Sequence, residues 1–385
     1  MKVGVLGIGI TQFGEIWDKG LRELLLESQL AALNDAKISP EQIDAIYTGN
    51  MAGGILSGQL HLGAMAAENL NLDKPSIRVE GACASGGLAI RQAVHAIESK
   101  QADIVMVNGV EKMTDVDTGQ VTTALMGAGD EELEGFNGLT FPGLYALLAS
   151  AYMNEFPKLT RDILAEVAVK NHFHGARNSY CQFKNEITLD TVKNATMVAD
   201  PLTLFDCSPI TDGAATIILA NEKISKELKT DVFITGSGLA NDTLGLARRN
   251  SLTEIIAGKK AADMAYAQAG INAQHVDFAE VHDCFTIAEV MAVEALGFAK
   301  KGEAYKLYEN KETYFDSKHP INTSGGLKAC GHPVGATGVK QAVEATIQLR
   351  GEAKGRQVKN AEVGVTHNVG GSGATAVVHV LRKVR

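Results

Sequence analysis

Short apolar runs and longer amphipathic stretches alternate along this chain. Residues 3–10 form the first apolar run and predict a buried strand. Similar runs at 102–108 and 361–367 predict further strands, while 88–99 and 339–349 have the spacing of helices that follow glycine-rich turns. Strands that alternate with helices of about 10–15 residues are typical of layered proteins. The pattern therefore predicts an α/β fold.

The pattern occurs twice, in the order strand, helix, strand, helix, strand, strand. Four segments of the first half resemble four of the second, and a repeat of this kind indicates duplication. The pairs are 3–9 with 232–238, 38–44 with 271–277, 87–94 with 338–343, and 212–219 with 372–379. Their offsets are 229, 233, about 250 and then 160, so the first half carries roughly 90 additional residues.

These offsets predict two similar halves and an insertion. The first half comprises residues 1–112 together with 206–228, and the second half comprises 229–385. Residues 113–205, between the two parts of the first half, form an inserted loop domain that is rich in helices and loops.

Composition and charge exclude several classes of protein. Of the 385 residues, 45% are hydrophobic and 21% are charged, which favours a folded protein over a disordered one. The net charge of −9 gives no global field for nucleic acid, so a polyanionic ligand must be bound by local cations. No apolar run approaches the roughly 18 residues of a membrane span. Five scattered cysteines form no disulfide framework, which predicts a reduced, cytoplasmic protein.

Cys83 is the first candidate for chemistry. It lies in Val79-Glu-Gly-Ala-Cys83-Ala-Ser-Gly-Gly87, at a predicted strand-to-helix turn of small residues. Helix N-termini offer free N–H groups and a positive dipole end, which lower the pKa of a thiol. The sequence therefore predicts a reactive nucleophile here. The structural alternative is a small buried cysteine, the usual fate of a free thiol.

His332 is the second candidate, in the segment Cys330-Gly331-His332-Pro333. The repeat places it at the position equivalent to Cys83, before the second of two similar helices. If the halves pack about a two-fold axis, the two helix N-termini meet and form a nucleophile–base pair. The structural alternative is a turn histidine that caps a helix.

Two further polar segments follow strands of the second half. They are Glu280-Val-His282-Asp-Cys284-Phe and Thr366-His367-Asn368-Val-Gly370-Gly371. A zinc site built from His282, Cys284, Cys330 and His332 has the right ligand types. In each pair, however, only one residue separates the two ligands, whereas the ligand pairs of structural zinc sites have two to four residues between them. We therefore predict no metal. Complete dinucleotide and P-loop motifs are absent.

Together these segments resemble the thiolase family over essentially the whole chain. In detail they are similar to the sterol-carrier-protein-x type and its archaeal relatives, which have His-Asp-Cys-Phe and His-Asn-x-Gly where most thiolases have Asn-Glu-Ala-Phe and Cys-x-Gly. The resemblance implies two duplicated α/β halves in a five-layered α/β/α/β/α body. The matching motifs are Cys83-Ala-Ser85, His282–Phe285, Gly331-His332-Pro333, Gly335–Gly338 and His367–Gly370.

The resemblance also implies catalytic roles. Cys83 would attack an acyl thioester and hold the acyl group, with His332 taking its proton. Asn368 stands where most thiolases have their second catalytic cysteine, so Cys284 is the expected acid/base for the α-carbon of acetyl-CoA. His367 is the alternative for that role.

Two oxyanion holes are implied as well. His282 together with His332 would stabilise the oxygen of the thioester enolate. The backbone N–H groups of Cys83 and Gly370 would bind the carbonyl oxygen of the acyl-enzyme. Cys330 has no implied role, and we expect it to be a small loop residue.

The implied function is acetyl-CoA C-acetyltransferase, with CoA thioesters as substrates and no metal or redox cofactor. Alternatives are a degradative thiolase for longer or branched 3-ketoacyl-CoA, a β-ketoacyl synthase, a retro-aldolase, or a binding scaffold with a vestigial site. The CoA-binding residues stay unassigned. The insertion, expected to cover the site, offers four cations for the nucleotide end of CoA, namely Lys158, Arg161, Lys170 and Arg177.

The resemblance also implies partners. Thiolases of this kind are homodimers or homotetramers. The archaeal relatives suggest an assembly with hydroxymethylglutaryl-CoA synthase and a small zinc-ribbon/OB-fold protein, which would place the chain in the mevalonate pathway. The sequence favours neither nucleic acid nor membrane as a partner.

Overall fold

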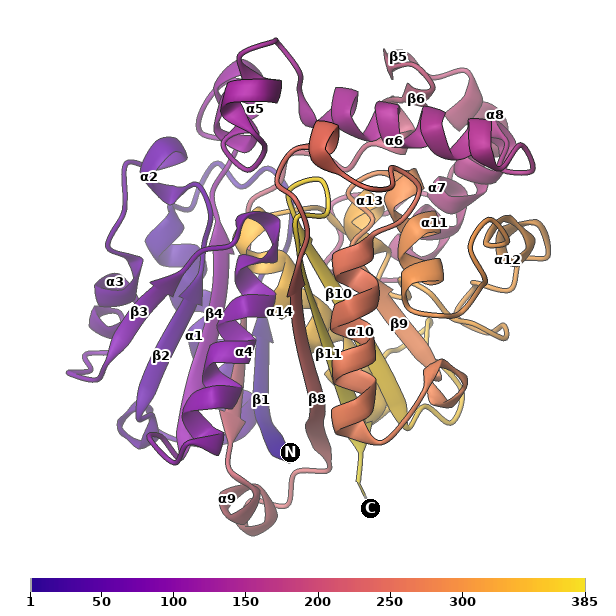
Figure 1. The fold of residues 1–385 in the computed structure, drawn as a ribbon. Helices are drawn as coiled ribbons and strands as arrows, with labels where there is room; N and C mark the ends of the chain where they lie inside the picture. The colour runs from indigo at the N-terminus through magenta and orange to yellow at the C-terminus, as the bar shows by residue number, and fades with distance from the viewer. Residues whose placement is uncertain (1, 385) are drawn as a thin grey trace.

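The computed structural model describes residues 2–384, and its strands form one nine-stranded mixed sheet (Figure 1). The order across the sheet is β3-β2-β4-β7-β1-β8-β11-β10-β9. A short antiparallel pairing of β1 with β8 joins the two halves. The strands are β1 (Val3–Ile10), β2 (Ala45–Gly49), β3 (Ser76–Val79), β4 (Ile104–Glu111), β7 (Gly213–Ala220), β8 (Val232–Asn241), β9 (Phe278–Val281), β10 (Val363–Gly370) and β11 (Thr375–Lys383).

The two halves repeat the same connectivity. The order β2-β4-β7-β1 in the first half is matched by β9-β10-β11-β8 in the second. In each half an aspartate before the second strand fixes the start of the next one. The Asp44 carboxylate accepts hydrogen bonds from the N–H groups of Asp103 and Ile104, and Asp277 does the same at Val363 and the residue before it. The same cap in both halves supports the duplication.

One of the predicted offsets is wrong by two residues. Val5 pairs with Leu219, and Ile234 pairs with Leu381, so the last strands of the two halves are related by an offset of 162 rather than 160. Both strands contain several small and β-branched residues in succession, at 213–218 in β7 and 375–378 in β11. Because side chains alternate with a period of two along a strand, a shift by two residues preserves the apolar face and matches nearly as well.

Helices separate and cover the two halves of the sheet (Figure 1). Helices α4 (Ser85–Glu98) and α14 (Thr337–Arg350) share one central hydrophobic cluster with strands of both halves. Helix α1 (Leu21–Ala36) packs on the other face of the first half, and α10 (Ile256–Ala269) on that of the second. These helices and sheet halves make the five predicted layers.

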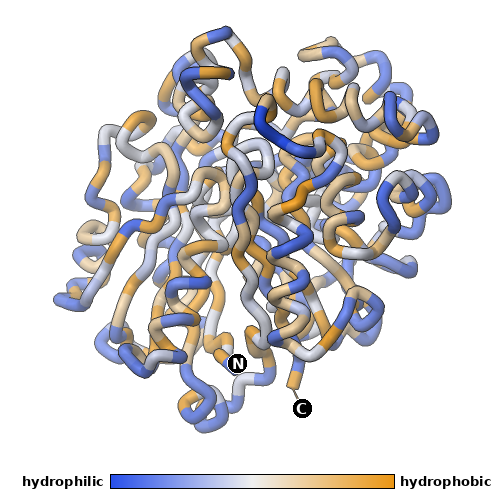
Figure 2. Tube along the Cα trace, in the orientation of Figure 1, coloured by the Kyte–Doolittle hydropathy of each residue, from blue (hydrophilic) through white to orange (hydrophobic). Residues whose placement is uncertain are grey.

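The alternation of residues along β7 shows how one strand serves two layers. Ala215, Ile217 and Leu219 face the central helices, whereas Ala214 and Ile218 belong to the cluster beneath α1. Side chains on opposite faces of a strand alternate, so a strand buried on both sides is apolar throughout. Figure 2 shows hydrophobic and hydrophilic residues alternating along the helices that border the sheet.

Two glycines let the central helices meet at their N-termini. A Cβ on Gly86 would lie 2.8 Å from the carbonyl oxygen of Gly335, and one on Gly338 would lie 2.2 Å from the backbone nitrogen of Gly87. Only a residue without a side chain fits such an approach. The contact brings the start of α4 against the start of α14, as the repeat predicted.

The predicted insertion lies across one end of the sheet (Figure 1). It contributes no strand to the main sheet among the described residues. Its elements are α5 (Thr118–Met126), α6 (Phe141–Glu155), α7 (Arg161–Gly175), α8 (Leu189–Lys193), β5 (Met197–Ala199) and β6 (Leu202–Thr203). Further short helices are α2 (Gly53–Leu56), α3 (Leu62–Glu68), α9 (Glu222–Glu227), α11 (Thr286–Ala295), α12 (Tyr305–Glu309) and α13 (Gly326–Cys330). Within residues 2–384, no helix has the length and apolarity needed to cross a bilayer.

Candidate active site

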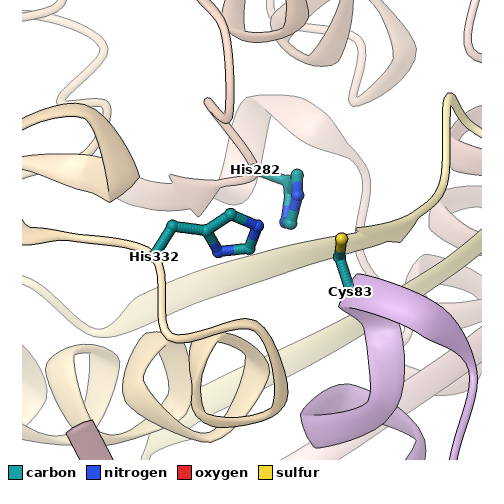
Figure 3. Close-up of side chains that lie close together, drawn as sticks. All are labelled: Cys83, His282 and His332. Atoms are coloured by element: carbon teal, nitrogen blue, oxygen red, sulfur yellow. The ribbon is translucent and has the colours of Figure 1, made fainter. Parts of the chain in front are cut away.

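Three predicted residues from distant parts of the chain converge at the helix N-termini (Figure 3). Cys83 precedes α4, His282 follows β9 and His332 precedes α14. The Cys83 sulfur and a ring nitrogen from each histidine all lie within 4.8 Å of one another. The two imidazoles meet edge to face with ring centroids 5.0 Å apart. Their exposed fractions are only 8%, 1% and 8%, so the group is largely shielded from water.

Cys83 lies in a 3-10 turn, Ala82–Ala84, held by the neighbouring serine. The Ser85 hydroxyl donates to the carbonyl of Ala82 and accepts from the N–H of Gly81. Burial raises the pKa of the Cys83 thiol to about 12, although the N–H groups of Gly371 and of Cys83 itself oppose this. The predicted net lowering by the helix N-terminus is therefore wrong, because desolvation of a thiolate outweighs the local N–H groups. Cys83 rests as a thiol.

His332 is held in the tautomer that leaves Nε2 free to accept a proton. Its Nδ1 lies 2.7 Å from the hydroxyl oxygen of Thr337, and that hydroxyl donates to the carbonyl of Pro333. The hydroxyl has one proton, so it accepts the Nδ1–H of the imidazole. Burial lowers the pKa of His332 to about 3, with Lys340 adding to the effect. The imidazole is therefore neutral and carries its lone pair on Nε2.

His282 is held in the opposite tautomer by Asn368. The Oδ1 of this amide accepts the N–H of Gly87, which fixes its orientation and leaves Nδ2 to donate. Nδ2 contacts Nδ1 of His282 at 3.2 Å and the carbonyl oxygen of Cys83 at 2.9 Å. Nδ1 of His282 therefore accepts, and the ring proton lies on Nε2. Among the described residues this nitrogen is buried without a hydrogen-bond partner. His282 does not itself line the cavity, but it lies against Cys83 and His332, which do.

The remaining predicted residues occupy different places. Cys284 is buried and lines the same cavity as Cys83 and His332. Gly371, one residue beyond the predicted Gly370, lines this cavity and directs its N–H at the Cys83 sulfur.

His367 does not line the cavity. Its Nε2 lies against Gly258 of α10, only 2.6 Å from where a Cβ of that residue would be. The His367 ring therefore lies on the outer face of β10, toward α10. Both ring nitrogens are buried and have no hydrogen-bond partner within residues 2–384, and burial lowers the pKa of the imidazole to about 4. His367 is therefore out of reach of a substrate at Cys83. The sequence-based alternative, in which His367 is the second base, does not fit this position.

The cavity has a volume of about 480 Å³ and reaches from the cysteines to the insertion. Its lining combines the reactive groups with apolar side chains and resembles an ordinary small-molecule pocket. The apolar lining residues are Met113, Val121, Leu125, Phe141, Pro142, Phe183, Val198, Leu204, Pro209, Ile210 and Phe285.

The four predicted cations of the insertion do not line this cavity. Lys170 is fully buried in an ion pair with Glu289, and Arg161 pairs with Asp206. Arg177 pairs with Glu186 and covers an aromatic ring. Each of these three cations is thus paired with a carboxylate of the protein. Their positions in the sequence could not distinguish a ligand-binding cation from one that is neutralised by a carboxylate.

The zinc set considered from the sequence does not assemble. Cys330 lies in a separate buried cluster with Phe13 and Cys181. Within the described residues the structure instead groups Cys83, His282 and His332, whose sulfur and nitrogen ligands suit zinc by type. These are the same three side chains that supply the thiol, the proton-accepting imidazole and the hydrogen-bond-donating imidazole described above.

The comparisons with known proteins agree with this arrangement. Residues 3–223 match the family described as "Thiolase, N-terminal domain", and residues 238–383 match "Thiolase C-terminal domain-like". The chain is 46% identical over 383 residues to an acetyl-CoA acetyltransferase of Methanothermobacter thermautotrophicus, covering 99% of both chains. It is 44% identical to one of Methanocaldococcus jannaschii, covering 100% of this chain and 99% of the relative. Human sterol carrier protein 2 is 31% identical, covering 98% of this chain and 71% of the relative.

Two solved structures show the same fold at low identity. The Ltp2-ChsH2(DUF35) aldolase has a TM-score of 0.87 at 22% identity, covering 100% of this chain and 98% of that one. Human mitochondrial 3-ketoacyl-CoA thiolase in complex with CoA has a TM-score of 0.77 at 19% identity, with the same coverage. With both family domains matched along nearly the whole chain, this protein belongs to the thiolase family.

Proposed function

We propose that the chain is an acetyl-CoA C-acetyltransferase, which joins two acetyl-CoA molecules into acetoacetyl-CoA or catalyses the reverse thiolysis. The observation that carries this proposal is the pair of histidines in opposite tautomers beside one thiol. One imidazole is arranged to accept a proton, and the other is arranged to donate a hydrogen bond. The acetyl-CoA acetyltransferases that are 44–46% identical over their full length support the choice of substrate.

The first half-reaction transfers an acetyl group to Cys83. The sulfur attacks the thioester carbonyl while Nε2 of His332 takes the thiol proton, as in other nucleophile–base pairs. The negative charge on the carbonyl oxygen is stabilised by backbone N–H groups of Cys83 and of the glycine turn. The sequence predicts the N–H of Gly370 for this role, whereas the N–H that faces the Cys83 sulfur is that of the next residue, Gly371. The C–S bond to CoA then breaks, and His332 returns the proton to the CoA sulfur.

The second half-reaction forms the carbon–carbon bond. The thiolate of Cys284 removes a proton from the α-carbon of a second acetyl-CoA. The enolate oxygen accepts the Nε2–H of His282, which has no hydrogen-bond partner among the described residues, and the His332 ring lies beside the His282 ring. The enolate carbon attacks the acetyl carbonyl on Cys83, and the bond from that carbonyl to the Cys83 sulfur breaks. The proton taken up by Cys284 then passes through His332 to the Cys83 sulfur, which restores the Cys83 thiol and the Cys284 thiolate for the next turnover. Each step uses protein groups only, so we propose no metal or redox cofactor.

A degradative thiolase for longer 3-ketoacyl-CoA is the second candidate. It would use the same residues. The observation in its favour is the apolar lining that the insertion contributes to the cavity, which could contact a longer acyl chain. A ketoacyl synthase would use both histidines, but the Gly331-His332-Pro333 and His282–Phe285 motifs argue against it. A retro-aldolase has no need of the acyl-accepting Cys83. The fold of the aldolase structure supplies no further argument at 22% identity.

We also propose a cytoplasmic homodimer or homotetramer. Strand β3 lies at one edge of the sheet and exposes Ile77, as a strand available for pairing does. A complex with hydroxymethylglutaryl-CoA synthase and a zinc-ribbon/OB-fold protein, as in a mevalonate pathway, would draw the unfavourable condensation forward. Light scattering gives the oligomeric state. Copurification from the native source without these partners counts against the complex.

Thiolysis of acetoacetyl-CoA by free CoA tests the proposed function. The wild-type chain should convert it into two acetyl-CoA, and Cys83→Ala should abolish the reaction. Cys207→Ala is the matched control, because this cysteine lines the same cavity and has no role in the steps above. No turnover of acetoacetyl-CoA with rapid cleavage of a longer 3-ketoacyl-CoA would favour the degradative enzyme. Equal loss in both variants would contradict the assignment of the nucleophile.

A further inference from the structure

The phenol of Tyr145 lies behind Cys284. This tyrosine belongs to α6 of the insertion and is 2% exposed. Its hydroxyl donates to the carbonyl oxygen of Gly371 at 3.2 Å and lies close enough to the sulfur of Cys284 to lower the pKa of that thiol. Its ring stacks on Phe285 with ring centroids 4.5 Å apart and planes inclined by 24°. One side chain from the insertion thus stacks on Phe285 and belongs to the same buried cluster as Cys284, the residue before it.

We propose that Tyr145 is a positioning residue for Cys284, holding its sulfur at the cavity and supporting its thiolate form. The inference rests on the proposed function, because it takes Cys284 as the group that moves the α-proton. It adds a role for the insertion, which would complete the acid/base of the second half-reaction as well as line the cavity.

The hydroxyl can serve both protonation states of Cys284. When Cys284 is a thiol, the phenol donates to the Gly371 carbonyl and can accept the weak S–H donor. When Cys284 is a thiolate, the phenol can turn its proton to the sulfur. Hydrogen bonds to charged groups are about twice as strong as neutral ones, so the phenol favours the thiolate. It does not touch the substrate in this arrangement.

The surroundings of Cys284 make this support necessary. Burial raises the pKa of the thiol well above its ordinary value, and the nearby Cys83 and Asp283 add to the rise. The hydrogen bond from Tyr145 and the N–H of Phe285 act in the opposite direction. Asp283 is itself engaged by backbone N–H groups of α13. The Tyr145 hydroxyl is therefore the side-chain group that opposes the burial of this sulfur.

The glycine turn does not depend on Tyr145 alone. The Arg249 guanidinium donates to the carbonyl and to the hydroxyl of Ser372, the next residue of the turn. Arg249 is also the cation whose charge acts on the Tyr145 phenol. With this second support, removal of the phenol oxygen should leave the N–H of Gly371 near Cys83. The main effect should then fall on Cys284, and Cys83 should keep its reactivity.

The test compares Tyr145→Phe with Tyr152→Phe. Tyr152 lies on the same helix, is equally buried, and hydrogen-bonds Glu294 away from the cavity. Two rates are measured for each protein: α-proton exchange of acetyl-CoA in deuterated water across a range of pH, and acetylation of Cys83 by acetyl-CoA.

The proposal predicts a selective change in Tyr145→Phe. Exchange should fall about ten- to a hundredfold, the effect of one hydrogen bond to a charged group, while Cys83 acetylation stays within about threefold of wild type. The basic limb of the exchange profile should move to higher pH, because the Cys284 thiolate loses its donor. Tyr152→Phe should change neither the exchange rate nor the profile. An unshifted profile in Tyr145→Phe, or equal losses of exchange and acetylation, overturns the proposal.

Two further measurements keep the outcome clear. Replacement of Tyr145 by a difluorotyrosine preserves its shape and acidifies the phenol, so the basic limb should move to lower pH. An unmoved limb would overturn the proposal even if Tyr145→Phe failed to fold. Wild type and Cys284→Ala identify the source of any failure. If wild type exchanges no α-proton, the proposed function fails. If wild type exchanges and the tyrosine variants match it, only the role of Tyr145 fails.

Discussion

The Asn368→Asp substitution tests the assignment of opposite histidine tautomers. The two side chains have nearly the same shape, but a carboxylate only accepts hydrogen bonds. Nδ1 of His282 would then have to donate, and the ring proton would leave Nε2, the nitrogen that the site leaves free. His332 should keep its tautomer, because Thr337 fixes it from the other side.

The magnitude follows from the loss of one donor to the enolate oxygen. The His282 Nε2–H is buried, and removal of one such donor from an oxyanion hole costs about a hundred- to a thousandfold in rate, or about 2.7–4 kcal/mol. We expect α-proton exchange of acetyl-CoA to fall by that factor. Acetylation of Cys83 should fall less than about tenfold, since its base and its N–H donors are retained.

Deuterium exchange into acetyl-CoA measures the first rate, and the release of free CoA in the first turnover measures the second. Asn108→Asp is the matched control, because Asn108 is a buried asparagine on β4, in the other half, that bonds Thr48 and Thr216. It tests for a general effect of a buried carboxylate. Equal losses of exchange and acetylation in Asn368→Asp, or no loss of exchange, would refute the reasoning on tautomers.

Three further predictions concern the base, the helix contact and the thiol. Thr337→Val should slow Cys83 acetylation about tenfold or more, because the tautomer of His332 is no longer fixed. The α-proton exchange of acetyl-CoA by enzyme acetylated beforehand should be less affected. Release of CoA in a single turnover measures the acetylation rate. Gly338→Ala should lower the free energy of unfolding by about 1–3 kcal/mol in urea denaturation, because its Cβ would overlap the backbone of α4, whereas Gly20→Ala meets nothing closer than 3.7 Å and should have little effect. Labelling of Cys83 by iodoacetamide requires the thiolate, and burial raises the pKa of that thiol to about 12, so the rate without ligand should keep rising about tenfold per pH unit from pH 7 to 9. A plateau below pH 8 would show a lowered pKa instead.

Several features of the fold and site could be predicted from the sequence. The periodic apolar runs and the internal repeat predicted the α/β layers, and the repeat placed Cys83 and His332 at equivalent helix N-termini. The meeting of these ends at Gly86 and Gly338 is the direct result of that duplication. The offset of the last strand was wrong because a period-two pattern does not distinguish shifts of two residues.

Other features depend on tertiary contacts that no local pattern contains. The direction of the Cys83 pKa shift depends on burial beneath the insertion, which outweighs the helix N-terminus. The alternation of faces along β10 could have separated His367 from Asn368, because neighbouring residues of a strand point to opposite sides. Tyr145 lies about 140 residues from Cys284, and only the packing of α6 on the second half reveals their contact.

Trapping the acyl-enzyme tests the central claim most directly. The chain is incubated with acetyl-CoA, digested at low pH and analysed by peptide mass spectrometry, using wild type, Cys83→Ala and Cys284→Ser. We expect one acetyl group on the peptide that contains Cys83 in wild type and more of it in Cys284→Ser, where the second half-reaction is blocked. No acetyl group should be found in Cys83→Ala. An acetyl group on Cys207 or Cys284, or thiolysis that persists without any acetyl-enzyme, would contradict the account.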